Sequence, residues 1–429
     1  MLSFTALSLL GLLALSVSAA ASVGLLGLML SGFYSSLPLT NAMGELAWGT
    51  SIEFLLVAIP LYILMGELLV CSGVAGKMYG AVAKWVSWLP GGLINSNIGA
   101  SALFAATSGS SVATSATIAT IALPEQEKNG YNGPLFMGSI AAGGTLGILI
   151  PPSINMIIYA LIANVSVPQL YLAATLPGLL LTCLFISVVM LACVIKPSWG
   201  GIKPAVSWTD RINSLPDLLP PLGIFVLVIG SIYSGIATAS ESAALGVLAA
   251  LLLGFWRRQL NWVVLSRAFE STMRTTGMIV LITLAAFFLN FVLSSIGLTT
   301  MLVEFVASMN LSPLGTILAI ILFYIILGCF MDTLAMLITT APLTVPIIVA
   351  LGFDPIWFGV LLIVLCETGQ LTPPFGMNLF VVQSIRNKGK FVDVIYGAAP
   401  FVLALFLLLG LLVAYPELAL WLPKVVSVS

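Results

Sequence analysis

The chain contains one interrupted apolar pattern twice, at a fixed separation. Gly147 stands four residues before the Pro151–Pro152 pair. Gly369 stands four residues before Pro373–Pro374, so the two patterns are 373 − 151 = 222 positions apart. Each Pro-Pro pair interrupts an apolar segment, because proline has no amide hydrogen to donate and leaves carbonyl groups of the preceding turn unpaired. Interrupted apolar helices at matching positions of two halves indicate the binding site of a membrane transporter.

Composition places the chain in a lipid bilayer. Hydrophobic residues make up 60% of the 429 residues and charged residues only 7%. About 20 helical residues cross the ~30 Å hydrocarbon layer, and many apolar runs here reach that length. The expected fold class is therefore an all-α polytopic membrane protein. Its expected spans are 4–30, 52–71, 135–163, 169–195, 217–236, 240–256, 275–297, 356–385 and 393–415. Two further apolar stretches, 91–128 and 313–350, are each interrupted near the middle.

The distribution of positive charge predicts the topology. If 91–128 and 313–350 are re-entrant hairpins, which enter and leave on one side, all 14 Lys and Arg residues except Lys424 share one face. The positive-inside rule makes that face cytoplasmic. The N-terminus is then expected in the cytoplasm and the C-terminus in the periplasm. Two stretches that mix Trp with basic residues, 77–88 and 261–274, are expected to be helices lying at the membrane interface.

The same order of membrane spans and re-entrant hairpins predicts two inverted repeats. Residues 1–205 form the first repeat and residues 238–429 the second, and residues 206–237 are a linker with a connecting span. The second repeat begins from the opposite side of the membrane, so its hairpin opens outward. Inverted repeats of this kind are a recurrent architecture for alternating access.

Oxygen-rich residues at the helix breaks predict cation sites. Carbonyl and hydroxyl oxygens are the ligands that hard cations prefer, and the broken helices supply both. We expect one cation site in each repeat. The first would use Ser108, Gly109, Ser110, Gly143, Gly144 and Thr145; the second would use Met331, Asp332, Thr333, Thr368, Gly369 and Thr372.

An anionic substrate fits the same region. Half-helices that begin at the breaks direct the positive ends of their dipoles toward the midplane, and no Lys or Arg maps there. The predicted substrate-binding residues are Ser110, Ser111, Ser153, Asn155, Asp332, Thr333 and Asn378. A carboxylate in mid-membrane is costly and by default functional, which makes Asp332 the strongest candidate. Glu67, Glu241 and Glu367 are expected nearer the interface, and either a functional or a structural role is open for each.

The sequence argues against enzymatic chemistry. The chain has no His, and no mid-membrane Lys is available to activate a serine of the 109–111 turn as a nucleophile. The five Cys fall in apolar segments without metal-ligand spacing and are expected to be small core residues. Neither a cofactor nor a nucleic-acid partner is expected. A transporter is therefore favoured; a standalone Na⁺- or H⁺-coupled anion symporter is one alternative, and a channel is less favoured.

The chain resembles the large, DctM-like membrane subunit of tripartite ATP-independent periplasmic (TRAP) transporters. The resemblance rests on residues 141–153 (AAGGTLGILIPPS), 235–244 (GIATASESAA), 352–360 (GFDPIWFGV) and 367–381 (ETGQLTPPFGMNLFV). Ala239 departs from it, because a Pro is expected there. The resemblance implies an elevator mechanism in which hairpins and broken helices move against a scaffold. It also implies Na⁺ at the two cation sites and an organic-acid substrate. The implied partners are a separate small four-span membrane subunit and a periplasmic substrate-binding protein, and the implied location is the inner membrane.

Overall fold

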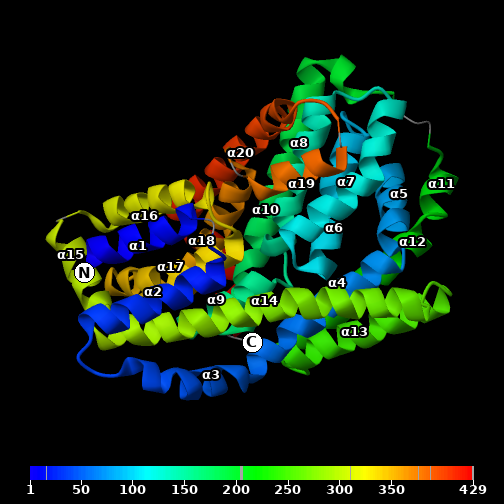
Figure 1. The fold of residues 1–429 in the computed structure, drawn as a ribbon. Coiled ribbons are helices and arrows are strands. Elements are labelled where there is room, and N and C mark those ends of the chain that lie inside the picture. Colours follow the sequence, from blue (N-terminus) through cyan, green and yellow to red (C-terminus); the bar gives the residue numbers. More distant parts are fainter. Residues whose placement is uncertain (16, 203–205, 310, 375, 387, 428–429) are drawn as a thin grey trace.

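The computed structural model describes residues 1–429 except 16, 203–205, 310, 375, 387 and 428–429 (Figure 1). Within the described part of the chain the regular structure is entirely helical, which confirms the expected all-α class. Among the described residues, seven helices are long and apolar enough to cross a membrane, or eight if the bent pair α8 and α9 is one span.

The described residues of the first half form twelve α-helices. They are α1 (Leu2–Ala14), α2 (Ala19–Tyr34), α3 (Met43–Ser51), α4 (Ala58–Cys71), α5 (Val74–Val86), α6 (Leu93–Ser108), α7 (Ser111–Lys128), α8 (Gly133–Leu149), α9 (Ile154–Ala163), α10 (Val167–Ile195), α11 (Trp208–Ile212) and α12 (Leu215–Tyr233). Short 3₁₀ turns are η1 (Leu39–Ala42), η2 (Phe54–Val57) and η3 (Pro197–Gly200).

The part of the second half that the structure describes forms nine more. They are α13 (Ala239–Trp256), α14 (Trp262–Ser295), α15 (Leu298–Ser308), α16 (Pro313–Gly328), α17 (Thr333–Ala350), α18 (Pro355–Leu371), α19 (Met377–Arg386), α20 (Phe391–Ala414) and α21 (Glu417–Ser427).

The expected helix breaks occur where Gly and Pro stand. Stretch 91–128 divides into α6 and α7 at Gly109, which has φ +60° in the left-handed region that glycine adopts without strain. Stretch 313–350 divides into α16 and α17 at residues 329–332. Helices α8 and α9 meet at 42°, and α18 and α19 are separated by residues 372–376.

Two helices form the centre of the molecule. Every residue of α8 from Leu135 to Leu149 is buried, and so is every residue of α18 from Trp357 to Leu371. Helix α8 packs against α6, α7, α18 and α20. Figure 1 shows the α6–α7 pair and the α16–α17 pair on opposite sides, with α8, α10 and α18 between them.

A second group of helices lies along one side of this centre. The long helix α14 packs along α2 and α4, and α13 packs against α4 and α12. Figure 1 shows α14 running nearly the full width of the molecule. The candidate site lies where α4 and α14 face the hairpins.

Two expectations about single helices were wrong. Segment 4–30 is not one span: α1 and α2 fold back on each other, and Phe4 contacts both Phe33 and Tyr34 with ring centroids 5.6 and 5.5 Å apart. Such ring contacts stabilise a hairpin that apolarity alone does not reveal. Residues 261–274 do not form a separate helix, because α14 runs from Trp262 to Ser295 and contains no Pro; Gly277, at the expected junction, does not end it. Residues 77–88 do fall mostly within a helix of their own, α5.

Candidate functional site

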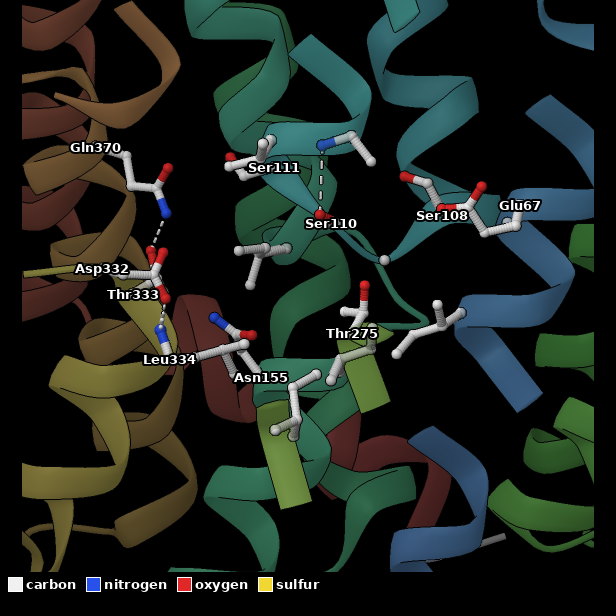
Figure 2. Close-up of a pocket in the computed structure, with 18 of the residues that line it drawn as sticks. Glu67, Ser108, Ser110, Ser111, Asn155, Thr275, Asp332, Thr333, Leu334 and Gln370 are labelled. Atoms are coloured by element: carbon white, nitrogen blue, oxygen red, sulfur yellow. Dashed lines mark hydrogen bonds between the residues drawn. The ribbon is translucent and has the colours of Figure 1, made fainter. Parts of the chain in front are cut away.

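The two interrupted hairpins meet at one cavity. It has a volume of about 150 Å³ and lies between the α6–α7 break, the start of α17, the start of α9, and helices α4 and α14 (Figure 2). Its polar side chains are Glu67, Ser108, Ser110, Ser111, Asn155, Thr275, Asp332, Thr333 and Gln370. Residues more than 200 positions apart in the sequence therefore line one small chamber.

The first hairpin tip is built by hydroxyl groups that cap helix ends. Ser110 adopts extended backbone before α7, and its side chain accepts a hydrogen bond from the amide of Ala113 (3.4 Å). Thr114 Oγ1 donates to the Ser110 carbonyl at 2.7 Å and also contacts Ser108 Oγ at 2.8 Å. The tip rests on the break of the neighbouring helix, because a Cβ on Gly109 would lie 3.0 Å from the Pro152 carbonyl oxygen.

The second hairpin tip is built around Asp332. Its carboxylate caps α17 by accepting a hydrogen bond from the amide of Leu334 at 3.1 Å. Thr333 accepts a hydrogen bond from the side chain of Gln370 on α18, as Figure 2 shows. An acidic N-cap suits the positive end of a helix dipole. The tip is thus held against α18 while one face of Asp332 lines the cavity.

The predicted cation ligands on α8 and α18 lie beside these tips. The Gly144 carbonyl accepts a hydrogen bond from Ser111 Oγ at 3.0 Å. The hydroxyl groups of Thr145, Thr368 and Thr372 donate to carbonyls of their own helices at 2.6, 2.7 and 2.6 Å. A hydroxyl oxygen that donates its hydrogen still has lone pairs to offer a cation. Both predicted sets of cation ligands stay predictions.

A buried contact joins the two halves of the chain. Ser111 Oγ donates to Glu367 Oε2 at 2.7 Å, and Asn378 Nδ2 donates to Ser111 Oγ at 3.0 Å and to the Ala141 carbonyl at 3.3 Å. Glu367 is fully buried, and its Oε1 has no partner within the described part of the chain. Glu367 thus lies in the protein interior, at the contact between the two halves; its depth relative to the membrane interface stays a prediction.

The predicted substrate residues do not all reach the cavity. Ser110, Ser111, Asn155, Asp332 and Thr333 line it.

Two predicted substrate residues lie outside the lining. Ser153 is buried beside the cavity, and its carbonyl accepts a hydrogen bond from Tyr171 at 3.3 Å. Asn378 instead belongs to the buried contact between the two halves, where its side chain donates a hydrogen bond to Ser111.

The other two glutamates divide between the two roles left open. Glu67 lines the cavity and accepts a hydrogen bond from Ser271 at 2.7 Å. Glu241 forms a capping box with Thr238 at the start of α13, which is a structural role.

The helix breaks that surround one polar cavity place this protein in the class of polytopic membrane transporters. The fold is similar to that of the YdaH transporter of Alcanivorax borkumensis, with a TM-score of 0.63 over 90% of this chain and 88% of that one. Sequence identity to YdaH is 15%, so this likeness concerns the fold alone.

Sequence comparison gives the family. The family described as "Tripartite ATP-independent periplasmic transporter, DctM component" matches residues 6–418. The chain is 31% identical to the C4-dicarboxylate TRAP transporter large permease protein DctM of Vibrio cholerae, over 96% of this chain and 95% of the relative. It is 30% identical to the ectoine TRAP transporter large permease protein TeaC of Halomonas elongata, over 93% and 97%.

A sialic acid TRAP transporter large permease protein, SiaM of Vibrio cholerae, is 32% identical over 87% of each chain. The chain therefore belongs to the DctM component family of TRAP transporters. It is a multi-pass inner-membrane transporter subunit rather than an enzyme.

Proposed function

We propose that this chain carries an organic acid across the inner membrane, driven by a Na⁺ gradient. A periplasmic binding protein delivers the substrate, and a separate small four-span membrane subunit completes the permease. The observation that carries the proposal is the meeting of both hairpin tips at one cavity, with Asp332 and several hydroxyl groups facing it. Relatives named for C4-dicarboxylate, ectoine and sialic acid support an organic solute.

The choice of Na⁺ rests on the donor set. Oxygen atoms of hydroxyl groups, of carbonyl groups and of the Asp332 and Glu67 carboxylates surround the tips, and such ligands suit a hard cation. Buried oxygens without hydrogen-bond partners in the described residues lie nearby, on Ser101, Ser115 and Glu367. Unpaired buried oxygens are costly unless an ion or water satisfies them. The absence of His from the sequence removes the commonest proton carrier.

An elevator movement is supported by the contact between the two groups of helices. Gly66 on α4 lies against the first hairpin tip, and a Cβ there would lie 3.2 Å from Ser108 Cα. We assign α4 and α14 to the scaffold and the hairpins, α8, α9, α18 and α19 to the moving domain. The glycine at this position lets the two backbones approach closely with no side chain interlocked between them.

Uptake in proteoliposomes tests the proposal. The chain is reconstituted with its small subunit, and candidate organic acids are offered under an imposed Na⁺ gradient, with and without the binding protein. Uptake that needs both Na⁺ and the binding protein is expected. Uptake without the binding protein, or driven by a pH gradient alone, would contradict the proposal and favour a standalone symporter.

A further inference from the structure

An apolar groove lies between α10 and α20 and shares no residue with the candidate transport cavity. The groove has a volume of about 570 Å³, and leucine and isoleucine side chains form most of its walls. Both helices are long and apolar enough to span a membrane, so the groove is expected at membrane depth. Its occupant must therefore present an apolar surface along most of its length.

Buried aromatic rings give the groove a fixed floor. Phe185 of α10 and Phe401 of α20 are fully buried and meet edge to face, with ring centroids 5.5 Å apart. Such a contact favours one separation of the two helices. On the outer side of the same helices, Leu191 and Leu403 are 63% and 69% exposed. The groove is thus shaped by the core of the protein and stays open toward its surroundings.

One end of the groove has a positive charge. Lys196 is exposed, directly follows the last residue of α10, and has its Nζ 4.7 Å from the centroid of the Trp199 ring. Trp199 is itself anchored, because its carbonyl accepts a hydrogen bond from the Asn132 amide at 3.2 Å. The indole face and the carbonyl end of α10 both favour a cation at this point. Tryptophan beside lysine is typical of the depth at which lipid head groups lie.

This lysine lacks a counter-charge within the protein. None of the described residues that line the groove is acidic, and Lys196 has no ion-pair partner in the part of the chain that the structure describes. The charge pattern predicts that it lies on the cytoplasmic face, where anionic lipids attract basic residues. An anionic group at this end of the groove would supply the missing charge.

The length of the groove matches one leaflet of a bilayer. From Leu184 to Lys196 the groove follows α10 for 196 − 184 = 12 residues, or about 18 Å at 1.5 Å per residue. Half of the ~30 Å hydrocarbon layer is about 15 Å. The hydroxyl of Ser187, which also lines the groove, already donates to the Cys183 carbonyl at 2.7 Å. An acyl chain therefore meets no unpaired hydroxyl donor along this length.

We propose that the α10–α20 groove is a binding site for an anionic phospholipid. One acyl chain lies along the groove, and the phosphate of the head group accepts hydrogen bonds from Lys196 Nζ. Basic pockets between membrane helices bind anionic head groups in this way. A helix of another protein would fill the apolar part but would leave Lys196 without a counter-charge. The inference concerns a surface away from the cavity and does not depend on which solute is transported.

Photo-crosslinking with defined lipids tests the proposed site. The chain is purified with its small subunit, stripped of bound lipid by detergent exchange, and mixed with phosphatidylglycerol that has a photoactivatable diazirine in one acyl chain. Phosphatidylcholine with the same labelled chain is the comparison, and mass spectrometry locates the crosslinks. Crosslinks are expected in both α10 and α20 along the groove. They should be about fivefold more abundant with phosphatidylglycerol than with phosphatidylcholine at equal concentration.

Two variants separate the head-group contact from the chain contact. Lys196→Gln should remove the preference for phosphatidylglycerol, whereas Lys77→Gln, at an exposed lysine of α5, should keep it. Leu191→Trp fills the groove with a ring and should lower crosslinking by both lipids. Its control is Leu179→Trp, on a 57% exposed side chain of α10 outside the groove, which should leave both unchanged.

Thermal unfolding gives a second measurement that needs no crosslink. A ligand that binds only the folded protein raises its unfolding temperature. Added phosphatidylglycerol should therefore stabilise the wild type and Lys77→Gln more than Lys196→Gln. Equal stabilisation of all three proteins would contradict a head-group contact at Lys196.

Four crosslinking results would overturn the inference. They are equal crosslinking by the two lipids, an unchanged preference in Lys196→Gln, unchanged crosslinking in Leu191→Trp, and competition by soluble glycerol 3-phosphate, which would assign the charged end to a free phosphate. Absence of groove crosslinks with either lipid would also overturn it, because another occupant, such as a helix of the small subunit, would then cover the groove.

Discussion

Glu367 connects the two halves of the chain through a single serine. Ser111 Oγ has one hydrogen but two acceptors within reach: Glu367 Oε2 at 2.7 Å and the Gly144 carbonyl at 3.0 Å. When Glu367 takes this hydrogen, the Gly144 carbonyl is left for another partner. The buried Glu367 carboxylate, in the second half, therefore competes for the Ser111 hydrogen with the Gly144 carbonyl, a predicted ligand of the first cation site.

Removing this carboxylate should destabilise the protein. Glu367→Ala leaves Ser111 and its neighbours without their acceptor, and we expect it to lower the free energy of unfolding by about 1–3 kcal/mol. Glu367→Gln keeps one acceptor oxygen and should lose less. Chemical unfolding in detergent, monitored by tryptophan fluorescence, measures both. The control is Glu304→Ala, which changes an exposed side chain of α15. An equal loss of unfolding free energy in this control, or no loss in Glu367→Ala, would show that the buried contact is not stabilising.

Single residues could be predicted from the sequence only where their chemistry is unusual for their segment. Asp332 stood out as a carboxylate in an apolar stretch, and Ser111 as a hydroxyl at a helix break. For Glu367 the role was left open and Thr275 was not selected, because their positions depend on how distant helices cross. Hydrophobic periodicity contains no information on such crossings.

Close approach of helix backbones sets the arrangement of the elements. Helix α8 crosses α20 where both have glycine: a Cβ on Gly138 would lie 2.0 Å from the Gly397 carbonyl oxygen, and a Cβ on Gly397 would lie 1.7 Å from the Pro134 carbonyl oxygen. Small residues at such crossings allow membrane helices to pack backbone to backbone. This crossing holds the broken helix of one half against the last long span of the other.

A methyl group at this crossing should force the two helices apart. Gly397→Ala places a Cβ against backbone, which cannot move aside as a side chain can, and overpacking of this kind costs about 1–3 kcal/mol or more. We expect loss of monodisperse protein in size-exclusion chromatography and a lower unfolding temperature. Gly410→Ala, on the same helix with nothing within 4 Å of the added Cβ, is the control. Tolerance of Gly397→Ala would mean that the crossing is looser than described.

Helix boundaries were predictable where Gly and Pro interrupt apolar runs, and not elsewhere. Both Pro-Pro breaks and both hairpin breaks fall at the predicted places. Segment 4–30 has neither Gly nor Pro between the end of α1 and the start of α2, and its fold into α1 and α2 depends on contacts such as Phe4 with Phe33. The small helices α15 and α21 were not predicted either, since their short apolar runs resemble ends of longer spans.

At the scale of the whole molecule, the two halves of the chain contact each other at the candidate site and again at a surface ion pair. Lys388, just after α19, pairs with Glu127 near the end of α7 at 2.5 Å. The charge pattern predicts this surface to be cytoplasmic, together with nearly all other Lys and Arg residues. The inverted repeats and the orientation of the termini remain predictions of that pattern.

Site-directed labelling tests the predicted orientation. In a variant with the five native cysteines replaced, Lys388→Cys and Lys424→Cys each introduce one thiol at a position whose native side chain is 62% or 60% exposed. A membrane-impermeant maleimide applied to spheroplasts should label only Lys424→Cys. Applied to inside-out vesicles, it should label only Lys388→Cys. The reverse pattern, with Lys388→Cys labelled in spheroplasts and Lys424→Cys in inside-out vesicles, would contradict the prediction that both stretches are re-entrant, because one full crossing reverses every later loop. Labelling of both from one side would contradict α20 as a membrane span.

The most direct test of the central claim is the effect of Asp332→Asn on Na⁺-driven uptake in proteoliposomes, with Asp354→Asn as the matched control. Both aspartates cap helices of the second half, Asp332 at α17 and Asp354 at α18, and asparagine can keep each cap. Only Asp332 lines the cavity between the hairpin tips. We predict that Asp332→Asn abolishes Na⁺-driven uptake while Asp354→Asn retains it. Normal uptake by a folded Asp332→Asn variant would show that the cavity between the tips is not the transport site.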